Sequence, residues 1–341
     1  MNLYIFPEAP VLDNGFGVGI AYAYNKLQPK EDDVVVWYTS KTDFPQLRKS
    51  HHIIKKPSAA SFRRIMNVLR GKPSHELSMN QLSFLKGLEF DAVHCDDTTF
   101  FPTLRRMMPD KHIVVRFHNC YARIEDRQRL LNVPLSRKFR MVLKAYYQVE
   151  RDIMNDRNST KIFVTQEDMD YYRSNFGIAS DSCVWVGEYD ALRSPRTYHP
   201  VANVDKLVWF GGVESHKYNS VRWFIDKVFP QVKQKYPFLT FHLYGAGTQQ
   251  FDNPAEGIFG HGFYEGNDVP GKGTSLYVNP DIIGSGIKLK LLTYLKEGVP
   301  FITTPFGFEG YSMQLVDDYC IVSEQDHWVE DICRFIQSHS S

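Results

Sequence analysis

Short apolar runs alternate with amphipathic segments along the first half of the chain. Runs rich in β-branched or aromatic residues predict strands at 2–7, 34–38, 91–94, 112–117 and 161–165. Apolar residues at intervals of three and four predict helices at 21–27, 134–156 and 166–177. Gly15, Gly17 and Gly19 predict a loop after the first strand. Because strands and helices alternate, the pattern predicts βαβ units and a parallel sheet.

The same alternation begins again after a segment at about 186–204, which we interpret as a crossover between domains. Strands are predicted at 207–210, 240–244, 257–260, 273–278 and 300–304, and helices at 220–236 and 325–339. The expected fold class is therefore α/β, with two doubly wound domains facing each other across a cleft. The expected boundaries are 1–190, 205–325 and a C-terminal helix at 326–341.

The composition supports a globular protein of the cytoplasm. The 341 residues are 43% hydrophobic, which allows a large core. We expect neither a signal peptide nor a membrane span, because no apolar run approaches the length that a bilayer requires. The five cysteines are scattered and never in C-x-x-C spacing, so a disulfide framework and a zinc site are not expected.

The net charge of +1 hides an asymmetry between the two halves. Residues 1–200 contain 29 Lys and Arg against 23 Asp and Glu, and residues 201–341 contain 11 against 16. The segment 44–75 has no acid, and 61–72 within it reads as a basic amphipathic helix. Such a helix can lie on an anionic membrane surface or face the core with a solvated basic side. No nucleic-acid partner is expected, because base-reading elements are missing.

Three glycine turns of the second half follow predicted strands: 211–212, 245–247 and 284–286. The last of them opens a helical run, where unpaired backbone N–H groups suit an anion such as a phosphate. Lys288 and Lys290 follow directly, at a helix N-terminus where cations are unfavourable. Their position makes most sense if a polyanion binds there as well. The alternative is a simple strand end with solvated lysines. Three such turns at equivalent places favour a phosphate-bearing ligand.

The motifs in these segments carry a family resemblance. LVWFGG, SVRWFIDKVFPQVKQKYPFLTFHLYGAG, GIFGHGF and GSGIKLKLLTYLKEGVPFITTPFGFEG occur in an order that resembles the donor-binding domain of the retaining GT-B glycosyltransferases of family 4, in the subgroup with a G-S-G loop. VRFHNCYARIEDR and FVTQEDMDYYRSNFG are similar to the family's N-terminal motifs. The resemblance implies the GT-B fold, with the acceptor bound mainly by the first domain and a nucleotide sugar by the second.

The resemblance also implies a set of site residues. Those expected to be catalytic are His118, Lys217 and Lys288, and Asn119 and Arg123 are expected on the acceptor side. The expected donor contacts are Gly17, Gly211, Gly212, Gly245, Phe263, Gly284, Ser285, Gly286, Ile287, Lys290, Thr293 and Glu309.

Two positions depart from the family pattern. Gly212 stands where the family often has an arginine on the diphosphate. Ser285 and Thr293 replace the family's E-x7-E pair, and threonine cannot chelate two ribose hydroxyls with a charged group. No cofactor besides the donor co-substrate, and no metal, is expected. No D-x-D-like metal clamp is evident: Asp96–Asp97 is the most plausible acid pair after a strand, and it lies in the acceptor half.

The sequence thus predicts a glycosyltransferase that moves a sugar from a nucleoside diphosphate sugar to a glycan or lipid-linked saccharide, with retention. The expected setting is surface polysaccharide synthesis in the cytoplasm, at the inner face of the membrane. The alternative is a degenerate GT-B protein that binds glycans or stabilises a partner. A nucleotide-sugar epimerase would need carboxylate acid–base residues, for which Glu309 is the only candidate.

Overall fold

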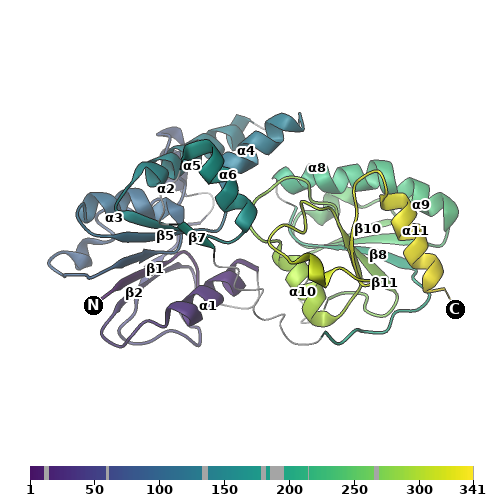
Figure 1. Ribbon diagram of the computed structural model, residues 1–341, viewed down its shortest axis with the longest axis horizontal. Helices are drawn as coiled ribbons and strands as arrows, with labels where there is room; N and C mark the ends of the chain where they lie inside the picture. The colour runs from purple at the N-terminus through teal and green to yellow at the C-terminus, as the bar shows by residue number, and fades with distance from the viewer. Residues whose placement is uncertain are drawn as a thin grey trace. The chain divides into compact units, whose positions relative to one another are not determined.

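The computed structural model describes residues 1–10, 15–58, 61–132, 137–177, 182–184, 196–213, 215–264 and 269–340. The chain divides into two compact units, Met1–Gly187 and Glu188–Ser341 (Figure 1). Each unit is an α/β fold around a sheet whose neighbouring strands pair in parallel. The two Rossmann-like sheets confirm the predicted fold class.

The first unit contains a seven-stranded sheet in the order β3-β2-β1-β4-β5-β6-β7. The central strands are buried because helices cover both faces, which explains their nearly continuous apolar sequences. The strands are β1 (Leu3–Phe6), β2 (Val34–Thr39), β3 (His52–Lys55), β4 (Val93–Cys95), β5 (Ile113–Phe117), β6 (Ser159–Phe163) and β7 (Ser182–Val184).

Helices cover the two faces of this sheet unequally. Helix α1 packs on one face through Ile20, Ala23 and Tyr24, while α3, α5 and α6 lie on the other (Figure 1). The helices are α1 (Gly15–Leu27), α2 (Phe62–Leu69), α3 (Phe101–Met107), α4 (Tyr121–Leu130), α5 (Arg137–Asn155) and α6 (Gln166–Phe176), with 3₁₀ turns η1 (Ser83–Leu85) and η2 (Thr98–Phe100).

The predicted glycine loop after β1 is wrong in one respect: Gly15, Gly17 and Gly19 belong to α1. Tertiary contacts overcome their weak helix propensity, because the following turns are buried against the sheet. The carbonyl of Gly19 also accepts a hydrogen bond of 3.0 Å from Arg116 of β5, which anchors this turn.

The second unit contains a six-stranded sheet in the order β10-β9-β8-β11-β12-β13. Its strands are β8 (Lys206–Phe210), β9 (Thr240–Tyr244), β10 (Ile258–Gly262), β11 (Ser275–Asn279), β12 (Phe301–Thr303) and β13 (Cys320–Val322). Helices α8 (Ser215–Trp223), α9 (Phe229–Lys235) and α11 (Trp328–Ser338) cover one face and α10 (Leu289–Glu297) the other (Figure 1). The short turns are η3 (Phe224–Val228), η4 (Thr248–Phe251), η5 (Pro254–Glu256) and η6 (Met313–Leu315).

The helix predicted at 220–236 begins five residues earlier and is not continuous. Residues 215–223 are α-helical, and 224–228 form a π turn before the chain resumes as α9. Pro230 explains the interruption, because it cannot donate a hydrogen bond to the carbonyl four residues before it. Lys217 therefore lies in the first turn of α8.

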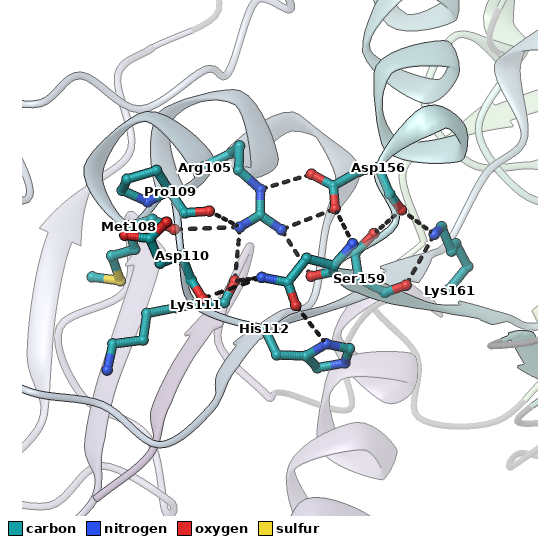
Figure 2. Close-up of polar contacts among 10 residues, drawn as sticks. Arg105, Met108, Pro109, Asp110, Lys111, His112, Asp156, Ser159 and Lys161 are labelled. Atoms are coloured by element: carbon teal, nitrogen blue, oxygen red, sulfur yellow. Dashed lines mark hydrogen bonds and ion pairs between the residues drawn. The ribbon is translucent and has the colours of Figure 1, made fainter.

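One arginine ties together two loops at the amino end of β5 and β6. The Arg105 guanidinium forms a bidentate ion pair with Asp156, at 2.7 and 3.1 Å (Figure 2). It also donates to the backbone carbonyls of Met108, Pro109, Lys111 and Asn158 at 2.7–3.3 Å. A planar fork with five N–H donors fits this set of acceptors, and a lysine cannot reach all of them.

We expect Arg105→Lys to destabilise the first unit. The substitution leaves several carbonyls of half-buried loops without their donor, at a cost of about 2–3 kcal/mol. Urea unfolding followed by circular dichroism measures the loss. Arg157→Ala, on the exposed neighbouring turn, is the control and should change the unfolding free energy by less than about 0.5 kcal/mol. Equal stability of the two variants would contradict a structural role for Arg105.

Candidate functional site

Both sheets have a topological switch point, where the strand order reverses. In the first unit it lies between β1 and β4, and in the second between β8 and β11. Ligands of open α/β sheets bind at the carboxyl ends of the strands beside such a point. The predicted site residues follow strands at these two places, so each unit is described by itself.

Two of the predicted glycine turns pack directly on each other in the second unit. Gly211 and Gly245, at the ends of β8 and β9, have φ values of 149° and 129°. A Cβ on Gly245 would lie 2.0 Å from the carbonyl oxygen of Gly211. Only glycine allows both this approach and this backbone conformation. The space around Gly212 is open within 4 Å of an added Cβ.

The third glycine turn leads from β11 to α10. Gly284 and Gly286 have φ values of 148° and 66°, and Ser285 between them is buried. Lys288 is the N-cap residue of α10. It was predicted within the first turn of the helix but lies one residue before it. Its Nζ atom donates to the carbonyl of Gly286 at 2.8 Å and lies 4.5 Å from the centre of the Phe306 ring.

Lys290 is held beneath this turn by an acid and an aromatic ring. Its Nζ atom lies 3.3 Å from Asp281 Oδ2 and 4.6 Å from the Trp209 ring centre. The side chain is 10% exposed. Burial lowers the pKa of Lys290 to about 8, against the opposing influence of Asp281, and the ammonium groups of Lys217 and Lys288 lower this pKa further.

Lys217 in α8 and Lys288 at the cap of α10 thus both act electrostatically on Lys290 of α10. Asp281, at the end of β11, is the carboxylate that pairs with Lys290. These like charges repel one another, and a bound polyanion would relieve the repulsion. The arrangement suits a diphosphate, which has oxygens enough for several ammonium groups.

The other predicted donor contacts vary in exposure. Thr293 donates its hydroxyl to the carbonyl of Leu289 in its own helix at 3.4 Å. Phe263 is exposed, and Ile287 and Glu309 are half-buried. Gly17 is buried in α1 of the first unit. Their contacts with a donor stay predictions.

In the first unit, His118 follows β5, the strand next to β4. Its Nε2 atom lies 3.1 Å from Asp96 Oδ2, and Arg116 lies 3.5 Å from the other oxygen of this buried carboxylate. A carboxylate partner fixes the Nε2 nitrogen as the protonated one. Asp97 accepts a hydrogen bond from the Thr99 backbone at 2.7 Å, and burial raises its pKa.

The carboxylates of Asp96 and Asp97 are thus both engaged by neighbouring groups of the protein. Across the described ranges, no group of three or more His, Cys, Asp or Glu side chains is arranged to hold a metal ion. The expectation of a transfer without metal stays a prediction.

The two predicted acceptor residues differ sharply. Asn119 is exposed next to His118. Arg123 is buried and donates to Asp168 at 2.9 Å, which joins α4 to α6. This ion pair gives Arg123 a structural role within the first unit, and its contact with an acceptor stays a prediction.

Comparison with known proteins places the second unit in a family. Residues 204–338 match the family described as glycosyl transferases group 1. The second unit therefore has a group 1 glycosyltransferase domain. No curated protein matches the chain. Within its described residues, no helix has the combination of length and apolar character needed to cross a bilayer.

Solved structures share the fold of this chain along nearly its whole length. WaaG, a glycosyltransferase involved in lipopolysaccharide biosynthesis, is 12% identical with a TM-score of 0.60, over 99% of this chain and 90% of WaaG. Sucrose-phosphate synthase from Thermosynechococcus elongatus is 10% identical with a TM-score of 0.62, over 98% and 90%. Anabaena HepE, solved with UDP and glucose, is 12% identical with a TM-score of 0.56, over 99% and 93%.

Sequence reasoning missed several residues that complete these arrangements. Asp281, Trp209 and Phe306 hold the lysines, and Arg116 holds Asp96. A signal existed for Asp281, because an acid directly after a buried strand lies at the carboxyl edge of the sheet. Trp209 and Phe306 have the sequence pattern of core residues, and nothing in the sequence indicates that they contact lysines.

We expect any affinity of this edge of the sheet for a nucleoside diphosphate, tested with UDP, to fall as the pH rises through about 8, because Lys290 then loses its charge. Calorimetry at a series of pH values measures the affinity. Lys290→Arg, which stays charged, should flatten the dependence. The same slope in both proteins would contradict the assignment.

The same pKa has a consequence for stability with the opposite sign. It lies below the usual value of 10.5, so the unfolded chain binds more protons between about 8 and 10.5. The contribution of Lys290 to the free energy of unfolding therefore rises with pH in that window. Stability and UDP affinity should thus change in opposite directions, which separates loss of charge from unfolding.

Proposed function

We propose that this protein is a glycosyltransferase that moves a sugar from a nucleoside diphosphate sugar to a glycan or lipid-linked saccharide, with retention, in surface polysaccharide synthesis. The observation that carries the donor proposal is the cluster of Lys217, Lys288 and Lys290 beside the glycine turns. All of it lies inside the matched segment 204–338. WaaG, a structural relative, acts in lipopolysaccharide biosynthesis, which supports the choice of acceptor class.

The chemistry follows from the charge that develops when the diphosphate leaves. Ammonium groups fixed near the bridging oxygen stabilise the transition state more than the ground state. The glycine turn at 284–286 would let phosphate oxygens approach the backbone closely, because Gly284 and Gly286 have no side chain in the way. We propose that the ammonium groups replace a divalent cation, so that no metal and no further cofactor is required.

In this proposal, His118 serves the sugar and acceptor side of the reaction. Asp96 holds the ring by its Nε2 atom, and the Asp96 carboxylate is in turn held by Arg116. These contacts fix the orientation of the imidazole ring. A side chain that positions a reacting sugar needs such a fixed orientation. Asn119, exposed in the next position, would contact the acceptor.

A second candidate function is a degenerate GT-B protein that binds a glycan or a partner without transferring a sugar. Thr293, which replaces the expected ribose-binding glutamate, gives its hydroxyl to the carbonyl of Leu289. Gly212 also removes one cation from the diphosphate site. Both features weaken donor binding relative to the family pattern.

Binding and transfer with a panel of nucleotide sugars test the proposal. Wild type should bind UDP or another nucleoside diphosphate and release it from the matching donor, also in the presence of EDTA. Lys217→Ala should weaken nucleotide binding roughly ten- to hundredfold, since a hydrogen bond to a charged group contributes about 1.5–3 kcal/mol. Lys296→Ala, exposed in the last turn of α10, is the control. Failure of wild type to bind any nucleotide would leave the second candidate.

We expect His118→Ala to lower kcat at least tenfold with little change in nucleotide affinity, because the ring serves the transition state. The matched control is His112→Ala at the opposite end of β5, where the imidazole contacts Asn158 and Thr160. Steady-state kinetics and calorimetry separate the two effects. If both variants lose activity equally, or neither does, His118 has no special role.

A further inference from the structure

Helix α2 has its apolar side turned outward. None of the residues of α2, all of which the structure describes, is buried. Phe62 is 76% exposed, Ile65 49% and Leu69 62%. These positions form one stripe at helical spacing. The interpretation of 61–72 as an ordinary helix with its apolar side in the core is therefore wrong.

Polar contacts hold the other side of the helix to the domain. Arg63 donates to a backbone carbonyl of the segment 74–76 at 3.2 Å, and Arg64 contacts a histidine ring of this segment at 2.9 Å. Asn67 donates to another carbonyl there at 3.5 Å. A surface helix of a globular protein normally has the reverse arrangement. Because polar contacts hold α2 in this orientation, the exposure of its apolar stripe is a property of the folded domain.

Helix α5 lies next to α2 and continues the basic character of this face. The two helices pack together, and Tyr146 of α5 lies beside Ser74 and Arg64. Both belong to the helical layer on the side of the sheet opposite α1 (Figure 1). Arg140, Met141 and Lys144 are exposed one turn apart along α5.

Two segments of the sequence without acids meet in this layer. Segment 44–75 contains eight basic residues and segment 127–149 contains six, and neither has an Asp or Glu. The carboxylates that follow them, Glu76 and Glu150, are buried. Glu76 is also paired with Lys72 and Arg106. Neither α2 nor the first two turns of α5 contain a carboxylate, whereas both contain cations.

We propose that α2 and the exposed side of α5, here called the α2–α5 surface, dock on an anionic lipid bilayer. Phe62, Ile65 and Leu69 enter the boundary between headgroups and acyl chains, while Arg70, Arg140 and Lys144 contact lipid phosphates. An apolar stripe beside basic residues is the pattern of a helix that lies in the membrane interface. Nucleic acid fits less well, because it offers no apolar layer for the stripe. The inference extends the proposed function by bringing the enzyme to a lipid-linked acceptor.

Cosedimentation with vesicles tests the surface without donor or acceptor, so its outcome is independent of sugar transfer. Wild type should bind vesicles of phosphatidylcholine with phosphatidylglycerol, and bind far less to phosphatidylcholine alone. Phe62→Ser with Leu69→Ser should weaken binding at least tenfold. Arg140→Glu with Lys144→Glu should do the same and remove most of the salt dependence. All four side chains are exposed, so thermal unfolding should be unchanged.

The control variants lie on the second unit, at similarly exposed positions. Met313→Ser and Lys296→Glu should leave vesicle binding within about twofold of wild type. Equal binding of all variants, or no binding by wild type, overturns the proposal. So does a concentration-dependent dimer that Phe62→Ser with Leu69→Ser abolishes, because the stripe would then contact a second copy.

Discussion

Lys290 places a buried charge at the carboxyl edge of the second sheet, and the fold has to compensate for it. The side chain of Lys290 is almost fully buried, and the ammonium groups of Lys217 and Lys288 lower its pKa further. Asp281 and the Trp209 ring offset part of the cost, which remains visible in the lowered pKa of Lys290. An apolar residue at position 290 would pack without a buried charge that needs compensation. That a lysine stands there instead indicates that its charge serves a ligand.

The glycine turns make this arrangement possible. Gly245 lies so close to the carbonyl of Gly211 that any side chain would separate β8 from β9 at their carboxyl ends. The turn at 284–286 brings Lys288 back over its own backbone, where it bonds Gly286. The chain thus places glycine turns and ammonium groups at one edge of one sheet. That edge is the place where parallel sheets bind ligands.

Much of this could be predicted from sequence, and the failures have physical causes. Strong apolar periodicity located the central strands of both sheets, but β3, β7 and β13 were missed because they are short and partly exposed. Gly15, Gly17 and Gly19 read as a loop because propensity is local, whereas their helix depends on packing and on Arg116. The approach of Lys217 to Lys290 joins segments far apart in the chain, so no spacing rule shows it. Periodicity predicted the apolar stripe of α2 but could not tell which side faces the domain, since that depends on contacts with 74–76.

Local charge and net charge have opposite signs in this protein. Residues 201–341 carry five more acids than bases, yet the switch point of their sheet gathers three lysines. Residues 1–200 carry six more bases than acids, yet the corresponding point of the first sheet holds Asp96, Asp97 and His118. Average composition therefore cannot explain either site. A cationic edge suits a leaving diphosphate, and a histidine oriented by a buried carboxylate suits a hydroxyl-bearing sugar. Part of the basic excess of the first half lies instead on α2 and α5, where exposed cations can meet a phosphate-rich surface.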